Sequence, residues 1–341
     1  RFMIAGHSEI NTIMRSMLGR TLLQRFLRRA VSADCTYAVI EMTSEGARQF
    51  RHAFIDIDAL IFTNLSPEHI ESHGSYEKYV EAKVSLARSL ENGNAYKHTI
   101  VANGDDTEIE KFLAVNVGEK CRYGIKDAQP FATNTNGSEL FWRGQKINLK
   151  LPGEFNIMNA LAAATFAESR GIAFDVIKRA LEKFDLIRGR MEKIDEGQDF
   201  FVIVDYAHTA DSLDRALGVY DGAEEICIMG GTGGGRDTAK RKVMGEIVDK
   251  HCSYIILTTE DPYDESPEEI ARDVAQGIKN CPYEFILDRR EAIKKAFQIA
   301  KKGSVVFITG KGSDSYIMGP KGKKILWSDA EVAREELRRF K

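Results

Sequence analysis

Residues 226–237 read Ile-Cys-Ile-Met-Gly-Gly-Thr-Gly-Gly-Gly-Arg-Asp, and this stretch decides the fold. An apolar run stops at a glycine-rich turn, and a helical pattern begins directly after it. That order is typical of a strand in a parallel sheet followed by its crossover helix.

The same alternation recurs along the whole chain. Residues 201–205, 254–258 and 305–309 repeat it in the second half, and residues 36–42 and 59–64 carry it in the first half. Strands that alternate with helices in this way predict an α/β fold with parallel sheets.

The middle of the chain has a different pattern. Residues 121–151 alternate polar and apolar residues, with turn signals at Asn136-Gly137 and Arg143-Gly144, which predicts antiparallel hairpins. Two helices are expected next, at 154–170 and 173–184.

The β/α alternation restarts at about residue 200, so we expect a domain boundary near residues 186–190. This gives a first domain of residues 1–186 and a second of residues 187–341. The last stretch, 329–341, is charged with a thin apolar stripe, and it predicts a solvent-exposed closing helix.

Composition narrows the class of protein. The 341 residues include 48 Lys and Arg against 51 Asp and Glu, so the chain offers no basic field for nucleic acid or a membrane surface. No apolar stretch approaches the ~20 residues of a membrane-spanning helix. Five scattered cysteines, without a Cys-x-x-Cys pair, predict neither a disulfide framework nor a zinc knuckle. We expect a cytoplasmic monomer that acts on small molecules.

Polar residues follow the two predicted strands of the first half. Glu41 and His69 stand at adjacent strand ends and could share a divalent cation, although a solvated loop histidine fits the pattern as well. In the helix over 75–90, Lys83 occupies a position of the apolar stripe. A neutral amine there could form a carbamate, a new metal ligand; alternatively its stem packs while its head reaches water.

The glycine-rich stretch resembles a dinucleotide fingerprint, but Arg236 stands where the third glycine belongs, so we discount NAD. A helix start beside an Arg suits a carboxylate or phosphate, and a simple tight turn explains it equally well. Gly310-Lys311 does not satisfy the Walker A pattern.

Further polar residues lie at useful places. Asn156 and Asn159 share a helix face and could address a heterocycle or a ribose, or pair locally. Asp205 closes a strand and could bind a ribose hydroxyl or belong to an N-cap network. Asp261 and Asp314 would suit a cationic amine, although acidic loops are usually solvated.

Taken in order, these segments resemble the Mur ligase family, most closely its UDP-N-acetylmuramoyl-tripeptide synthetases. The matching segments are Glu41-Met42-Thr43-Ser44, Asn64-Leu65-Ser66-Pro67-Glu68-His69, His73-Gly74, Ala82-Lys83, Asn103-Gly104-Asp105-Asp106, Leu151-Pro152-Gly153 through Asn159, Gly189-Arg190-Met191-Glu192, Asp205-Tyr206-Ala207-His208-Thr209, Gly233-Gly234-Gly235-Arg236-Asp237, Glu260-Asp261-Pro262, Asp288-Arg289-Arg290 and Gly310-Lys311-Gly312. Each motif is weak alone, but so many in one order make a specific signal.

The resemblance implies a central ATP-type domain followed by a Rossmann-like domain, and ATP-dependent ligation of an amino acid to a UDP-muramoyl dipeptide through an acyl phosphate. By the resemblance, Glu41 and His69 hold Mg²⁺, and a carbamylated Lys83 supports a second Mg²⁺ and catalysis. The other implied roles are adenine contacts for Asn156 and Asn159, ribose and phosphate contacts for Asp205 and Arg190, and an amino-acid pocket with Arg236, Asp261, Tyr263, Gly310 and Asp314.

The chain also departs from the family pattern. The family's UDP-binding domain and Gly-Lys-Thr loop precede the Glu41 motif, where this chain has only 40 residues, so we expect a truncated ligase of weak or no activity. Tyr263 replaces the Arg that diaminopimelate-adding members carry, which leaves lysine or diaminopimelate open. Two alternatives remain: a non-catalytic binding relative, and another amide ligase such as a folylpolyglutamate synthetase.

Overall fold

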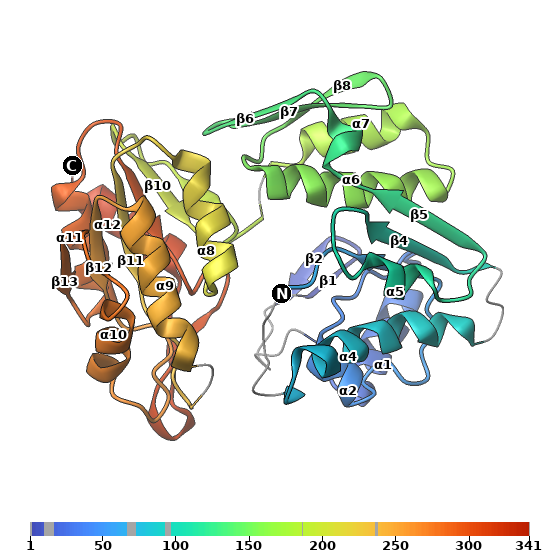
Figure 1. Ribbon diagram of the computed structural model, residues 1–341, viewed down its shortest axis with the longest axis horizontal. Helices are drawn as coiled ribbons and strands as arrows, with labels where there is room; N and C mark the ends of the chain where they lie inside the picture. The colour runs from blue at the N-terminus through green and yellow to red at the C-terminus, as the bar shows by residue number, and fades with distance from the viewer. Residues whose placement is uncertain are drawn as a thin grey trace. The chain divides into compact units, whose positions relative to one another are not determined.

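The computed structural model describes residues 2–9, 17–66, 73–92, 97–185, 187–235 and 238–340. The chain forms two compact units, one of residues 1–127 and 159–177, the other of residues 128–158 and 178–341. Each contains a parallel sheet flanked by helices (Figure 1), so the α/β prediction is confirmed. The domain boundary expected near residues 186–190 stays a prediction.

The first unit is organised around a three-stranded parallel sheet of β3 (Ala59–Phe62), β4 (Thr99–Asn103) and β5 (Glu119–Tyr123), in that order. α4 (Tyr76–Arg88) and the short α5 (Ile109–Leu113) cross between the strands, and Phe62 stacks on Phe112 with ring centroids 3.9 Å apart. The remaining elements of its N-terminal part are β1 (Phe2–Ile4), β2 (His7–Glu9), α1 (Arg20–Ser32) and α2 (Ser44–Arg48).

The predicted hairpins are found, but they begin later than expected. β6 (Phe131–Asn134), β7 (Gly137–Trp142) and β8 (Gln145–Leu149) form an antiparallel sheet, and its turns fall at the two predicted positions. The strand at Cys121 instead pairs in parallel with β4, because α5 carries the chain over to lie beside it. α6 (Glu154–Ser169) and α7 (Phe174–Lys183) follow as predicted.

The second unit holds a six-stranded sheet with the order β13-β12-β11-β14-β10-β9. Its strands are β9 (Glu192–Ile194), β10 (Phe201–Val204), β11 (Glu225–Met229), β12 (Tyr254–Leu257), β13 (Tyr283–Phe285) and β14 (Val305–Ile308). All pairings are parallel except that of β9 with β10. A separate hairpin joins β15 (Tyr316–Met318) to β16 (Lys324–Leu326).

Helices cover both faces of this sheet (Figure 1). One face packs against α8 (Ala210–Leu217), α9 (Thr238–His251) and α10 (Pro267–Ala275). The other packs against α11 (Arg289–Ile299) and α12 (Asp329–Phe340). Burial on both faces explains why these strands are continuously apolar rather than alternating.

Two predictions about individual elements are wrong. Residues 36–42 form no strand: they pair with none of the described strands, not even at the open edge of β3, and Val39 is 90% exposed. α12 is not a solvated helix, because Ala333 and Leu337 are buried in the core of the second unit. β4 was not predicted, although all five of its residues are buried.

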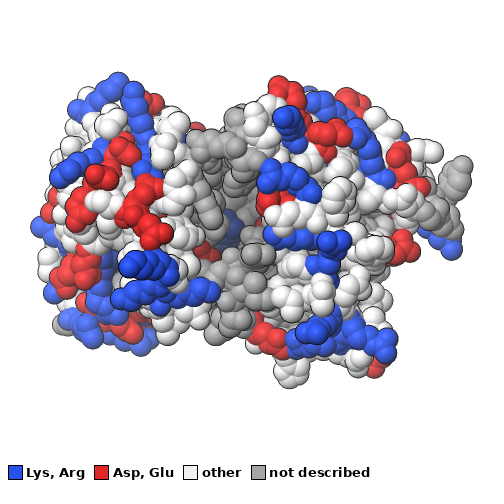
Figure 2. Space-filling model, turned by 90° about the horizontal axis from the view of Figure 1, so that it is seen from below, with Lys and Arg blue, Asp and Glu red and all other residues white. Residues whose placement is uncertain are grey.

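Surface charge follows the composition. On the face in Figure 2, acidic and basic side chains are interspersed over the described surface. Among the described residues, no helix combines the length and apolar character needed to cross a bilayer.

Candidate functional site

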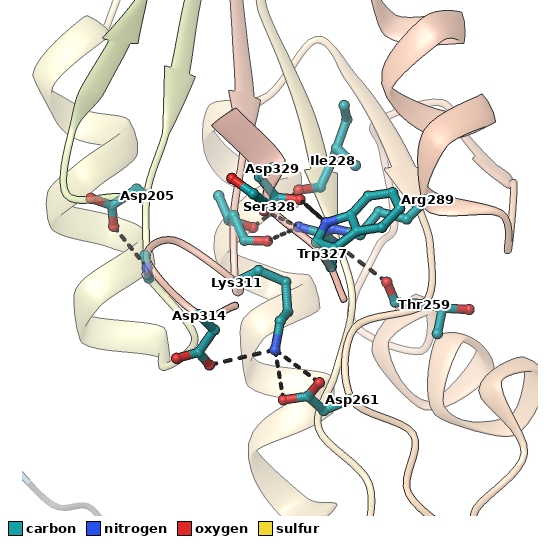
Figure 3. A network of polar contacts seen from close by, with 12 residues as sticks. Asp205, Ile228, Thr259, Asp261, Arg289, Lys311, Asp314, Trp327, Ser328 and Asp329 are labelled. Carbon is teal, nitrogen blue, oxygen red and sulfur yellow. Dashed lines mark hydrogen bonds and ion pairs between the residues drawn. The ribbon is translucent and has the colours of Figure 1, made fainter. Parts of the chain in front are cut away.

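Four loops meet at one edge of the six-stranded sheet. β14 lies between β10 and β11, and β12 lies beside β11, so the loops after these four parallel strands leave the sheet at the same edge. These loops carry five of the residues named above: Asp205, Asp261, Tyr263, Gly310 and Asp314. Figure 3 shows Asp205, Asp261 and Asp314 at this edge.

Lys311 is the buried centre of this group. It follows β14, its side chain is only 1% exposed, and its Nζ donates to both oxygens of Asp261 at 2.8 and 2.9 Å. Its Nζ also lies 3.4 Å from Asp314 Oδ2 (Figure 3). One ammonium therefore faces two carboxyl groups, and burial raises the pKa of the Asp314 carboxyl.

Asp261 holds further loops together. Its Oδ1 accepts the backbone N–H of Met318 at 2.8 Å, and its carbonyl accepts the N–H of Gly233 at 2.8 Å. Tyr263 adds a third link, because its N–H donates to the Met318 carbonyl at 3.0 Å. The β15–β16 hairpin is thereby fixed to the loops that follow β11 and β12.

Glu260 is a second buried acid beside Lys311. Burial raises the pKa of this carboxyl, and the charges of Arg289 and Lys311 partly oppose that rise. Its Oε1 accepts the Thr232 hydroxyl at 3.0 Å. Gly310 has φ +97°, and a Cβ there would lie 2.2 Å from Glu260 Oε2, so only glycine permits this approach.

Arg289 and Asp329 form a buried ion pair behind these loops, which sequence reasoning missed. The Arg289 guanidinium binds Asp329 at 2.8 and 2.7 Å, and the two side chains are 1% and 0% exposed. Arg289 also donates to the carbonyl of Thr259 (Figure 3) and to that of Thr309, so it joins the loops after β12 and β14. The motif Asp288-Arg289-Arg290 pointed to this arginine in the sequence, but it did not indicate that Asp329 is its partner.

Asp205 and Arg190 differ in accessibility. Both oxygens of Asp205 accept backbone N–H groups at 2.7 Å, from Met191 and Ala207, and burial raises the pKa of this carboxyl. Arg190 is exposed, and its guanidinium lies 4.4 Å from the centre of the Tyr206 ring. Asp205 therefore shapes the loop, whereas Arg190 presents a charge at its surface.

The two asparagines of α6 also differ. Asn156 is buried, and its amide nitrogen donates to the Pro152 carbonyl at 2.8 Å. Asn159 is exposed on the next turn of the same helix. The sequence left open whether these amides pair locally, and the hydrogen bond of Asn156 to the Pro152 carbonyl is such a local contact.

The first unit brings Lys83 close to the segment that contains Glu41. Lys83 is half-buried, and its Nζ lies 3.5 Å from the carbonyl oxygen of Met42, while Glu41 is exposed. The next residues are ordered by hydrogen bonds: the Thr43 side chain caps α2, and the buried Ser44 hydroxyl lies 3.1 Å from His73 Nε2.

Two predicted site residues, His69 and Arg236, lie outside the described residues. Within the described ranges, no group of three or more His, Cys, Asp or Glu side chains is arranged to hold a metal ion. The metal site predicted at Glu41, His69 and Lys83 therefore stays a prediction.

Comparisons with known proteins show which family the chain matches. Residues 3–167 match the Mur ligase middle domain, and residues 189–312 match the Mur ligase glutamate ligase domain. A UDP-N-acetylmuramoyl-L-alanyl-D-glutamate–2,6-diaminopimelate ligase of Bacillus licheniformis is 35% identical over 94% of this chain and 68% of its own length. The chain belongs to the Mur ligase family.

Other Mur ligases give the same result. The ligase of the same name from Caldanaerobacter subterraneus is 36% identical over 92% of this chain and 66% of its own length. A solved structure with that name is 28% identical, with a TM-score of 0.61, and the match covers 95% of this chain and 69% of that one. The chain thus spans about two thirds of the length of the relatives it matches.

Proposed function

We propose that the protein carrying this chain is a cytoplasmic, ATP-dependent amide ligase of peptidoglycan synthesis. It adds a diamino acid to UDP-N-acetylmuramoyl-L-alanyl-D-glutamate. The observation that carries the proposal is the activity in the names of the two relatives, which are 36% and 35% identical over more than nine tenths of this chain. A monomer that binds neither nucleic acid nor membrane fits the mixed surface charge.

The reaction places negative charge at the centre of the site. The dipeptide carboxylate takes the γ-phosphoryl group of ATP to give an acyl phosphate, the amine attacks the acyl carbon, and phosphate leaves. Such charge is best stabilised by cations already in position. In our proposal Asn156 and Asn159 contact the adenine of ATP. Arg190 and Asp205 contact its ribose and phosphates. The exposed guanidinium of Arg190 supports a contact with phosphate.

Mg²⁺ would neutralise phosphoryl oxygens when bound. We propose that Glu41 and His69 hold one ion and that a carbamylated Lys83 supports a second. The donor set of the described residues fits Mg²⁺, because the Glu41 carboxylate and the Met42 carbonyl are oxygen ligands and Mg²⁺ retains several waters. The position of Lys83 Nζ beside the Met42 carbonyl supports a role for this side chain at the same place.

The amino-acid pocket is assigned to the strand-end loops of the second unit, with Arg236, Asp261, Tyr263, Gly310 and Asp314. Asp314 supports recognition of an amine, because its side chain is 31% exposed, whereas Lys311 beside it is buried. Tyr263 supplies no cation for a second carboxylate, so we propose that lysine or another simple diamine is preferred to diaminopimelate.

The complete gene product tests the reaction. Purified protein with ATP, UDP-muramoyl dipeptide and each of a panel of amino acids should release ADP and phosphate and form the tripeptide product, measured by coupled assay and mass spectrometry. Reactions without dipeptide, or without amino acid, are the controls. Calorimetric binding of nucleotide and amino acid by the complete protein, with no turnover, would instead identify a non-catalytic relative.

Tyr263→Arg tests the choice of amino acid. A cation at this position should improve kcat/KM for diaminopimelate by roughly tenfold, the effect of about one charge-assisted hydrogen bond. The matched control is Tyr283→Arg, at an exposed aromatic on β13. A clear preference of the unaltered protein for diaminopimelate would show that another cation serves its second carboxylate.

A further inference from the structure

Lys311 has no role in the proposed reaction so far, yet it is the most buried charge of the amino-acid pocket. The side chain is 1% exposed, and its ammonium has carboxylate oxygens at 2.8, 2.9 and 3.4 Å. A buried ammonium is tolerated only when its partners surround it closely. Here the partners are two of the residues assigned to the pocket, Asp261 and Asp314.

The two carboxylates are bound unequally. Asp261 gives both oxygens to Lys311 and also accepts the Met318 N–H, and its side chain is 13% exposed. Asp314 gives one oxygen at a longer distance, and its side chain is 31% exposed. Among the described residues, the hydrogen bond from Lys311 reaches only one oxygen of Asp314, so the other oxygen remains available to a ligand.

The backbone around Lys311 fixes this arrangement. The Asp314 N–H donates to the Lys311 carbonyl at 2.8 Å, so the two residues lie on one tight turn. Gly312 within that turn has φ +46°, and a Cβ there would lie 2.6 Å from the Gly189 carbonyl oxygen. The turn is therefore packed closely on its neighbours, and it holds the Asp314 carboxylate 3.4 Å from the Lys311 ammonium.

We propose that Lys311 is a positioning residue for the amino-acid substrate. It neutralises Asp261 and orients Asp314, whose second oxygen accepts the side-chain ammonium of a diamino acid. This inference rests on the proposed function, since it names the group at that site which recognises the amine.

The closing experiment compares Lys311→Met, Asp314→Asn and the double variant in the complete protein. Lys311→Met should raise KM for L-lysine about tenfold or more, while kcat and KM for ATP change by less than about threefold, because one charge-assisted contact is lost in binding. In the Asp314→Asn background, Lys311→Met should add little, because both changes remove the same contact.

Folding is controlled separately. Lys311→Met leaves Asp261 buried without its partner, so Lys311→Met/Asp261→Asn provides a protein without that unpaired charge. Relative to Asp261→Asn alone, this variant should show the same rise in KM for L-lysine, since Asp261 itself belongs to the proposed pocket. Lys301→Met, which breaks the exposed Lys301–Glu224 pair, is the matched control.

Two results would overturn the inference: an unchanged KM for L-lysine in both Lys311 variants, or effects of Lys311→Met and Asp314→Asn that simply add. If the unaltered protein ligates no amino acid, the proposed function fails, and calorimetric binding of L-lysine then decides the inference alone. In that case Lys311→Met must weaken the binding of L-lysine about tenfold. If the unaltered protein does not bind L-lysine, both the proposed function and this inference are overturned.

Discussion

The two units hold their charged side chains in opposite ways. In the second unit, Lys311 and Arg289 have side chains that are 1% exposed, and each binds a carboxylate at 2.7–2.9 Å. In the first unit, Lys83 is half-buried and lies 3.5 Å from a carbonyl oxygen, and Glu41 is exposed. Lys311 and Arg289 follow parallel strands of the six-stranded sheet, whereas Lys83 lies within α4 and Glu41 lies just before α2.

The difference has a physical cause. A buried ion has no water to replace a missing partner, so the protein must supply its hydrogen bonds in the folded state. A half-exposed ion can take them from water or from a ligand. Substitutions at the buried pairs should therefore cost stability first, whereas substitutions around Lys83 should cost activity first.

The largest expected effect on stability is at Arg289. Arg289→Met leaves Asp329 buried without a charged partner, although the Trp327 indole N–H still donates to it, and should lower the free energy of unfolding by about 3–5 kcal/mol in urea titrations. Arg289→Met/Asp329→Asn should recover part of that loss, and Arg215→Met, at an exposed pair with Asp211, should change stability by less than about 1 kcal/mol. A loss at Arg289 no greater than at Arg215 would contradict the contrast between the units.

Lys83→Ala should have the complementary effect. Ligation by the complete protein should fall about 100-fold or more if this side chain supports the charge of the reaction, while stability changes little. Added short carboxylic acids should restore part of the activity if a carbamate is the missing group. Lys78→Ala, at an exposed position of α4, is the control, and activity that is lost without rescue counts against the carbamate.

Glu225 gives a pH-dependent test within the second unit. Burial, and more weakly Asp221, raise the pKa of this carboxyl to about 8. The folded state therefore holds a proton that the unfolded state has released between about pH 4.5 and 8, so this residue lowers stability as pH rises through that range.

Glu225→Gln should remove that loss. The variant should match the unaltered protein below about pH 4.5 and be more stable by a few kcal/mol at most above pH 8 in thermal or urea unfolding. The neighbouring Glu224→Gln, at an exposed residue, should show no such dependence. Equal curves for Glu225→Gln and the unaltered protein would show that Glu225 is not buried as a neutral acid.

The smallest effects concern helix caps in the two units. Thr209 and Ser212 form a reciprocal capping box at the start of α8, whereas Thr43 makes a single capping bond at the start of the five-residue α2. Thr209→Ala should lower the free energy of unfolding by about 1 kcal/mol, and Thr43→Ala by less. Urea titrations of both variants measure this, and a larger loss at Thr43 would reverse the comparison.

Much of the fold could be predicted because the signals are local. The helices at 154–169 and 174–183, the hairpin turns and four of the second unit's strands follow from periodicity and turn residues within short windows. Residues 36–42 have the same local character as those strands but form none, because the pairing and burial of a strand depend on residues elsewhere in the chain.

The sequence alone determined the α/β class, the order of motifs and hence the family, because each depends on residue type and spacing. Only the tertiary structure decided that Lys311 binds Asp261, that Arg289 binds Asp329, and that Asp205 and Asn156 are already bonded to backbone groups. The two ion pairs join residues 50 and 40 positions apart. Such partners are chosen by the packing of strand-end loops and the cost of a buried unpaired charge, which act only once the chain has folded.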